Sequence, residues 1–203
     1  MRTLFAALAL FTFACATPQS HAQAGSAAPA QEFVLDPEHT QVAFSINRFG
    51  FNHVLGRFDN LAGTVMLDQP RPERSSVSAV IQVASLSSGN ATRDEHLRGE
   101  RWLDAAQFPT MRFQSTSVQR TGESTADVTG DLTLHGVTAP VTLHVTLNQI
   151  GAAPNNQRPA AGFSATGTLS RAAFGITAAP QLIADEVTIT IEALAQPPVS
   201  PAP

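Results

Sequence analysis

Apolar and polar residues alternate with a period of two along most of the chain. Val42, Phe44 and Ile46 share one face of a predicted strand, and the residues between them share the other. Such alternation is typical of a sheet with one apolar and one solvated face. The pattern recurs along the chain, and it predicts eight strands over residues 40–49, 57–68, 76–86, 110–118, 125–134, 140–149, 161–170 and 186–195.

Turn-forming residues separate these strands, among them Pro70, Gly122, Gly136 and Pro180. Eight sequential antiparallel strands with one apolar face can close into a barrel, and closure removes the exposed edges of the sheet. We therefore predict an all-β fold, an eight-stranded antiparallel barrel. At this strand number the interior is either filled by side chains or wide enough for one slender ligand.

An outer-membrane barrel would show the same alternation with its apolar face turned outward. Such a barrel needs a girdle of aromatic residues at each membrane interface. This chain has no Tyr and one Trp, so the composition argues against that class.

One segment, residues 90–106 between the third and fourth predicted strands, loses the period of two. Its central part, residues 93–104, holds seven charged side chains and a histidine. Asn90 or Thr92 can cap the start of a helix, and Pro109 follows the end, so the segment predicts one or two short helices. A helical insertion at this place would cover one mouth of the barrel.

The N-terminal residues differ in composition from the strand region. Residues 1–24 carry one positive charge, then an apolar run and then Ala22-Gln23-Ala24, which is the order of a secretory signal peptide rather than of a membrane span. Cys15 offers an alternative, because a lipidated cysteine would make the protein a lipoprotein. Between these interpretations, the sequence favours cleavage near Ala24.

The rest of the chain divides into a linker, one domain and a tail. Residues 25–31 are predicted to be a linker and the Pro-rich residues 196–203 a disordered tail, which leaves one domain over residues 32–195. Without residues 1–24 the chain has no cysteine, eleven Arg, no Lys and sixteen Asp and Glu, a formal net charge of −5. Disulfides and thiolate ligands are thereby excluded. Nucleic acid and anionic membrane surfaces need clustered positive charge, so neither is expected as the main partner.

Several motifs, in order along the chain, resemble the signature of the YceI family. They are Leu35-Asp36-Pro37-x-His39-Thr40, Arg93-Asp94-x-His96-Leu97-Arg98, Trp102-Leu103-Asp104, Phe108-Pro109, Phe113-x-Ser115, the stretch 130–138 and Arg171-x-x-Phe174-Gly175. The resemblance covers residues 33–195. It implies a lipocalin-like barrel, secreted to the periplasm, that holds a polyisoprenoid, an isoprenoid quinone or another amphipathic lipid and needs no cofactor. Whether two chains pair as a homodimer stays open.

One position departs from the family pattern. Relatives often have a histidine in a His-x-Gly context where this chain has Arg48-Phe49-Gly50. Arg48 is in phase with the inward-facing residues of its strand, so it should point inward or lie at the rim. If it touches the head of a ligand, it favours an acidic head such as a phosphate, through bidentate contacts. The alternative is an arginine that extends into solvent or pairs with Asp94.

The candidate ligand-binding residues form a polar group at the barrel mouth and an aromatic group along the interior. They are Arg48, Arg93, Asp94 and His96, with Phe44, Phe58, Trp102, Phe108, Phe113, Phe163 and Phe174. The polar residues of the insertion have a second interpretation, a hydrogen-bond network that fixes the insertion to the barrel. The aromatic residues could equally be a packed core, but the resemblance favours a channel.

The other histidines do not suggest a metal site, because no short spacing of ligands such as His-x-x-x-His occurs. His39 follows a turn and should cap it locally, and His53 should be solvated between strands. His135 and His144 are in phase with polar residues and should face outward.

The sequence thus predicts a non-catalytic periplasmic carrier for an isoprenoid or another long-chain lipid. Two alternatives remain open. One is a lipid-modifying enzyme that uses His96 and Asp94 with a nearby serine, although no Gly-x-Ser-x-Gly motif is present. The other is a barrel with a solid core that serves only as an interaction module.

Overall fold

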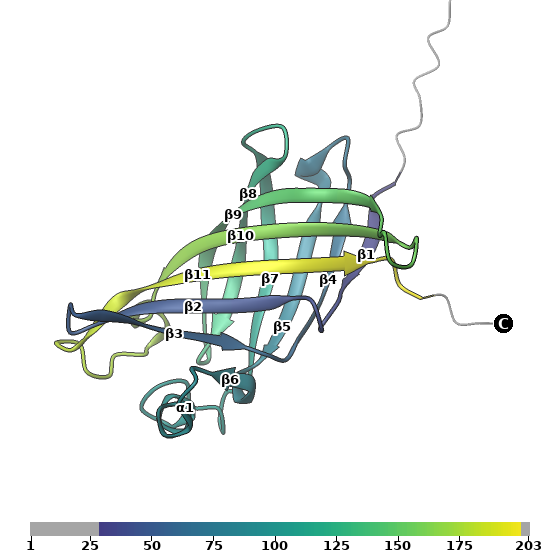
Figure 1. Ribbon diagram of the computed structural model, residues 1–203. Coiled ribbons are helices and arrows are strands. Elements are labelled where there is room, and N and C mark those ends of the chain that lie inside the picture. Colours follow the sequence, from purple (N-terminus) through teal and green to yellow (C-terminus); the bar gives the residue numbers. More distant parts are fainter. Residues whose placement is uncertain (1–28, 200–203) are drawn as a thin grey trace, which may run out of the picture.

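The strands of the protein form one antiparallel sheet that closes on itself (Figure 1). The computed structural model describes residues 29–199. Its strands are β1 (Gln31–Leu35), β2 (Gln41–Arg48), β3 (Asn52–Phe58), β4 (Leu61–Leu67), β5 (Ser76–Gln82), β6 (Leu86–Ser87), β7 (Thr110–Arg120), β8 (Thr125–Leu134), β9 (Val137–Ala152), β10 (Pro159–Ser170) and β11 (Ile183–Gln196). Its helices are α1 (Ala91–Arg98) and the short 3₁₀ helices η1 (Pro72–Arg74), η2 (Val83–Ser85) and η3 (Ala172–Phe174).

Three positions in the wall of the barrel are each filled by two strands with a break between them. β11 pairs with β1 through its last residues and with β2 through residues 183–192. At the neighbouring position in the wall, β4 pairs with β1 and β3 pairs with β2. β5 pairs with β4 and β6 pairs with β3, so β5 and β6 share a third position. With β1 and β2, β3 and β4, and β5 and β6 each counted as one position, the ring has eight strands. The predicted eight-stranded antiparallel barrel is therefore confirmed, as is the short helical insertion between the third and fourth predicted strands.

The breaks are also where the predicted boundaries are wrong. The sequence predicts one strand over 57–68, but Asp59 and Asn60 interrupt it, and β3 begins at Asn52. His53 therefore lies in a strand, exposed, and not between strands. The sequence signal is weak here because Leu55 of β3 faces solvent with 65% of its surface exposed, which breaks the alternation.

The ends of the chain give two smaller corrections. β1 begins at Gln31, inside the predicted linker, and β11 extends to Gln196, inside the predicted tail. The predicted signal peptide, residues 1–24, and Cys15 lie outside the described residues. Between residues 29 and 199, the structure contains no helix that is both long and apolar enough to cross a membrane.

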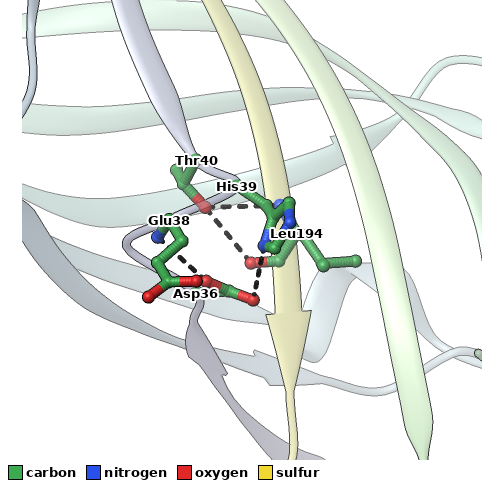
Figure 2. Close-up of polar contacts among 5 residues, drawn as sticks. All are labelled: Asp36, Glu38, His39, Thr40 and Leu194. Carbon is green, nitrogen blue, oxygen red and sulfur yellow. Dashed lines mark hydrogen bonds and ion pairs between the residues drawn. The ribbon is translucent and has the colours of Figure 1, made fainter. Parts of the chain in front are cut away.

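A compact polar turn holds the break between β1 and β2 against β11 (Figure 2). The backbone N–H of Asp36 donates to the carbonyl of Leu194 at 2.8 Å, and the Thr40 hydroxyl donates to the same oxygen at 3.2 Å. The Asp36 carboxylate accepts from the Glu38 N–H and from the His39 ring, each at 2.9 Å. Burial alone would raise the pKa of Asp36, but these hydrogen bonds outweigh it and hold the pKa below 3.8. The local capping role predicted for His39 is confirmed.

Packing inside the barrel is uneven. Phe33, Val83 and Phe174 are fully buried, each with 1% of its surface exposed. By contrast, inward-facing residues in the middle of the strands, such as Val42 and Phe44, are only partly buried although they point away from solvent. A side chain that points into the barrel keeps accessible surface only where the interior is hollow. The barrel therefore does not have a solid core.

Candidate functional site

Two apolar cavities, each of about 330 Å³, occupy the barrel interior. This volume lies within the range of about 300–1,000 Å³ that is usual for small-molecule sites. We call the one beside α1 the insertion cavity and the other the far cavity. Val42 and Ile81 line both, so the two cavities adjoin at these residues, which we call the waist.

The far cavity is lined mainly by aliphatic residues of the long strands, with Phe113 and Phe163 among them. Its rim carries short polar side chains and two charged ones, Arg120 and Glu123, which are close in sequence and opposite in sign. The Arg120 guanidinium donates to the backbone carbonyls of Gly122 and Glu123 at 2.7 and 3.2 Å. The charge at this mouth is therefore balanced.

The insertion cavity has a different charge. Its wall is apolar and includes Phe44, Phe58 and Trp102, but four basic side chains also line it. They are Arg48, Arg93, His96 and Arg171. None of the lining residues that the structure describes is acidic. A cavity that presents guanidinium groups without a carboxylate among apolar walls can hold an anionic or strongly polar ligand head at that place.

Arg171 is the most deeply placed of these cations, with 5% of its surface exposed. Its guanidinium donates to three backbone carbonyls, those of Ala184 at 2.9 Å, Ile176 at 2.7 Å and Ile183 at 3.0 Å. It also lies 5.6 Å from the ring centroid of Trp102. Burial lowers the pKa of Arg171, an effect that the nearby Asp185 opposes. Since a guanidinium has five N–H donors, two remain after these three bonds.

Sequence reasoning did not select Arg171 as a ligand-binding residue. The only available signal was its place in the motif Arg171-x-x-Phe174-Gly175. An arginine at the end of an apolar strand is usually solvated, and nothing in the alternation indicates that the following loop folds back over it.

A small hydrogen-bond network ties α1 to Ser88, the residue that follows β6. The buried carboxylate of Asp94 accepts from the Ser88 N–H at 2.9 Å and from its hydroxyl. Arg93 donates to the hydroxyl and carbonyl of Ser88, both at 2.7 Å. Asn90 caps α1 by accepting from the Arg93 N–H at 3.0 Å. The Asp94 carboxylate thus braces α1 against Ser88, and Asp94 is not among the residues that line the insertion cavity.

His96 and Asp94 do not form the pair that an enzyme hypothesis needs. Residues two apart on a helix point to different faces. His96 is exposed and lines the insertion cavity, while Asp94 is turned toward Ser88. Nor do His, Cys, Asp and Glu side chains gather in threes as metal ligands anywhere in residues 29–199.

Arg48 lies at the rim of the insertion cavity, as its phase predicts. Its guanidinium carbon lies 4.0 Å from the centroid of the Phe49 ring. The proposed alternative partner, Asp94, bonds to Ser88 instead. Arg48 is exposed, so its guanidinium is accessible to a ligand at the mouth.

The candidate aromatic residues fall into two groups. Phe44, Phe58 and Trp102 line the insertion cavity, and Phe113 and Phe163 line the far cavity. The ring centroids of Phe44 and Phe58 are 5.8 Å apart. Gly56, opposite Phe44 on the neighbouring strand, leaves the space that the Phe44 ring fills, because a Cβ at this position would collide with it.

Phe108 and Phe174 lie outside both cavities. Phe108 packs against His135, with 4.9 Å between ring centroids, and against Gly136. The carbonyl of Phe174 is 3.1 Å from Nδ1 of His135. The prediction that His135 faces solvent is therefore wrong, because its turn folds it against these two residues. His144 does face outward, where it bonds to Asp127 at 2.7 Å.

Comparisons with known proteins identify relatives of the whole barrel. Residues 33–195 match the family described as YceI-like domain. A UPF0312 protein of Pseudomonas putida is 42% identical over 179 residues, which cover 87% of this chain and 88% of the relative. One from Pseudomonas syringae pv. syringae is 43% identical over 152 residues, which cover 73% and 78%. These matches confirm the family resemblance that the motifs predict.

Solved structures give the same result for the fold. BcnA of Burkholderia cenocepacia aligns with a TM-score of 0.72 and 26% identity, over 80% of this chain and 99% of BcnA. A domain of Saccharophagus degradans described as polyisoprenoid binding aligns with a TM-score of 0.59 and 16% identity, over 83% of this chain and 99% of that domain. At that identity the second likeness concerns the fold alone.

Proposed function

Since the chain belongs to the YceI-like domain family, we propose that it is a non-catalytic periplasmic carrier that holds an isoprenoid or another long-chain amphipathic lipid inside its barrel. The observation that carries this proposal is the pair of apolar cavities that meet at Val42 and Ile81. A chain laid along the barrel would bury its methylenes at about 0.8 kcal/mol each. The polyisoprenoid-binding domain of the same fold is consistent with such a ligand.

The charge distribution supports one direction for the ligand. We place its polar head in the insertion cavity, where Arg48, Arg93, His96 and Arg171 supply donors and where no acidic side chain of the described residues lines the wall. The hydrocarbon chain then passes the waist into the far cavity. The residues proposed to contact the ligand are these four, together with Phe44, Phe58, Trp102, Phe113 and Phe163.

Native mass spectrometry of gently purified protein, followed by lipid extraction, tests the carrier proposal. We expect a bound lipid of constant mass, which the denatured protein loses. Repeated recovery of empty protein that also takes up neither an isoprenoid quinone nor a fatty amide would contradict the proposal.

The direction of the ligand can be tested with two probes of equal chain length, geranylgeranyl phosphate and geranylgeraniol. We expect Arg48→Gln to weaken binding of the phosphate about tenfold, because it removes a charge-assisted contact, and to leave the alcohol unchanged. Arg120→Gln is the matched control, since Arg120 lines the far cavity. An equal loss of affinity for the phosphate in both variants would contradict the proposed direction.

The periplasmic location can be tested by cell fractionation of the full-length chain. We expect the protein among those released by osmotic shock, in a form that lacks the residues before Gly25. Recovery with the membranes through a lipid attached to Cys15 would contradict the location proposed here and favour the lipoprotein alternative.

A further inference from the structure

A group of exposed apolar side chains lies beside the mouth of the insertion cavity. Phe51 has 91% of its surface exposed, Leu182 48% and Phe49 41%. Phe49 and Phe51 belong to the turn between β2 and β3, and Leu182 to the loop before β11. The Phe49 N–H donates to the Leu182 carbonyl at 2.8 Å, so the two loops are joined. We call these three residues the apolar tip.

The backbone conformation of the turn at position 49 is unfavourable for a phenylalanine. Phe49 has φ = 57° and Gly50 has φ = 74°, and the Phe51 N–H donates to the Arg48 carbonyl at 3.1 Å. Two successive positive φ angles at the centre of a hairpin turn favour Asn or Gly. A phenylalanine in the left-handed region is costly, and such strain is concentrated at functional positions. The core does not explain the choice of Phe49 and Phe51, because both rings are exposed.

Both loops at this tip are free of formal charge. Residues 49–56 and 172–184 contain no Asp, Glu, Lys or Arg. The charged residues next to the apolar tip are Arg48, whose guanidinium lies over the Phe49 ring, and Asp185, which follows the second loop. A membrane interface accepts aromatic and aliphatic side chains in such a setting, with basic groups just behind them.

The apolar tip is continuous with the cavity. Arg48 and Ile183 are paired across β2 and β11, and both line the insertion cavity. Arg48 is followed in the chain by Phe49 of the apolar tip, and Ile183 is preceded by Leu182 of the apolar tip. A water-insoluble chain leaving the cavity at this edge would pass directly onto the exposed rings.

We propose that the apolar tip inserts into the surface of a lipid bilayer and so allows the ligand to pass between the bilayer and the insertion cavity without crossing water. This inference rests on the proposed carrier function. Because the chain lacking residues 1–24 has a net charge of −5, apolar insertion and not attraction to anionic lipid should supply the binding energy. Binding to a neutral bilayer should therefore survive high salt.

Sedimentation with vesicles of phosphatidylethanolamine and phosphatidylcholine, using the protein with residues 1–24 removed, tests the proposal. We expect the wild type to bind, and the double variant Phe49→Asn/Phe51→Ser to bind about tenfold more weakly because two rings no longer insert. Asn suits the left-handed position, so the variant should keep its fold, which thermal unfolding verifies. Phe51→Ser alone, at a position that is 91% exposed, provides a second variant with an intermediate loss.

Val199→Ser is the matched control, because Val199 is 77% exposed but follows β11 at the far end of the barrel. It should bind vesicles like the wild type. No binding by the wild type, equal binding by the double variant, or capture of a protein partner in place of vesicles would overturn the proposal. Native mass spectrometry of the same samples separates the two proposals: protein that holds lipid but ignores vesicles refutes only the docking, whereas persistently empty protein refutes the carrier.

Discussion

The two ends of the barrel differ in charge and in covering. The insertion cavity has four basic side chains and is covered by α1 and the turns that follow it, whereas the far cavity has one Arg and one Glu and no such insertion. The apolar wall is common to both. The difference teaches that the polar residues make the two ends of this barrel unlike, while the strands give both cavities the same apolar wall.

The largest expected effect on this contrast comes from Arg171→Met. This change removes a buried guanidinium that binds three carbonyls, and leaves those acceptors unpaired. We expect the free energy of unfolding to fall by about 3 kcal/mol. Urea denaturation measures it. Arg120→Met at the far end should change stability by less than about 0.5 kcal/mol. Equal losses would mean that the two ends are not structurally different.

Asp94→Ala should loosen the cover of the insertion cavity alone. Ser88 loses the carboxylate that accepts from its N–H and hydroxyl, so we expect the free energy of unfolding to fall by about 2 kcal/mol. Limited proteolysis should then cut within residues 88–109 first. Glu95→Ala, at the exposed neighbouring position, is the control and should leave the insertion protected. Protection of the insertion in the Asp94 variant would contradict the bracing role.

Val42→Phe should separate the two cavities by filling the waist. We expect affinity for geranylgeraniol to fall about tenfold, or about 1.4 kcal/mol, with little change for the shorter geraniol. Fluorescence competition assays can compare the two probes. Val187→Phe is the control, because Val187 lines only the insertion cavity and should affect both probes alike. Equal effects of Val42→Phe on both probes would show that the chain does not pass the waist.

The smallest expected effect is a pH dependence at the insertion end. Hydrogen bonds from Ser170 and from the Ala172 N–H hold the pKa of Asp185 below 3.8. The folded pKa is lower than the unfolded one, so this stability is present above pH 3.8 and is lost as the pH falls through the folded value. Asp185 is exposed, and the loss should be less than about 1 kcal/mol. Urea denaturation at a series of pH values should show a flatter profile for Asp185→Asn; an unchanged profile would contradict it.

The barrel could be predicted because each strand such as Val141–Leu147 repeats the same alternation, and the period depends only on local sequence. The breaks in the barrel wall could not be predicted, because Asp59 and Asn60 interrupt the ladder of paired strands without interrupting the apolar pattern on either side. Likewise, alternation shows that Val42 faces inward, but not whether opposing side chains meet across the interior. The size of the hollow interior depends on the distances between opposing side chains, which the sequence pattern does not contain.

For the site, the sequence placed the aromatic residues of the strands better than those of the loops, because Phe108 and Phe174 lie outside both cavities. Phe44 and Phe163 lie on strand phases that must face inward, so their placement follows from the period. The orientation of Asp94 depends on where the helix docks, and Ser88 decides this through a loop that has no periodicity. Arg171 was missed for a similar reason, since the loop that buries it is recognised only in three dimensions.

The break between β1 and β2 and the break between β3 and β4 lie at the same height, because Val42 pairs with Phe58 and both breaks adjoin these residues. The β2–β3 hairpin is consequently tied sideways to β11 and β6, while β1 and β4 form their own ladder. A rotation of the hairpin need not disturb the pairing of β1 with β4. We therefore expect the wall around the insertion cavity to be mechanically more compliant than the wall around the far cavity.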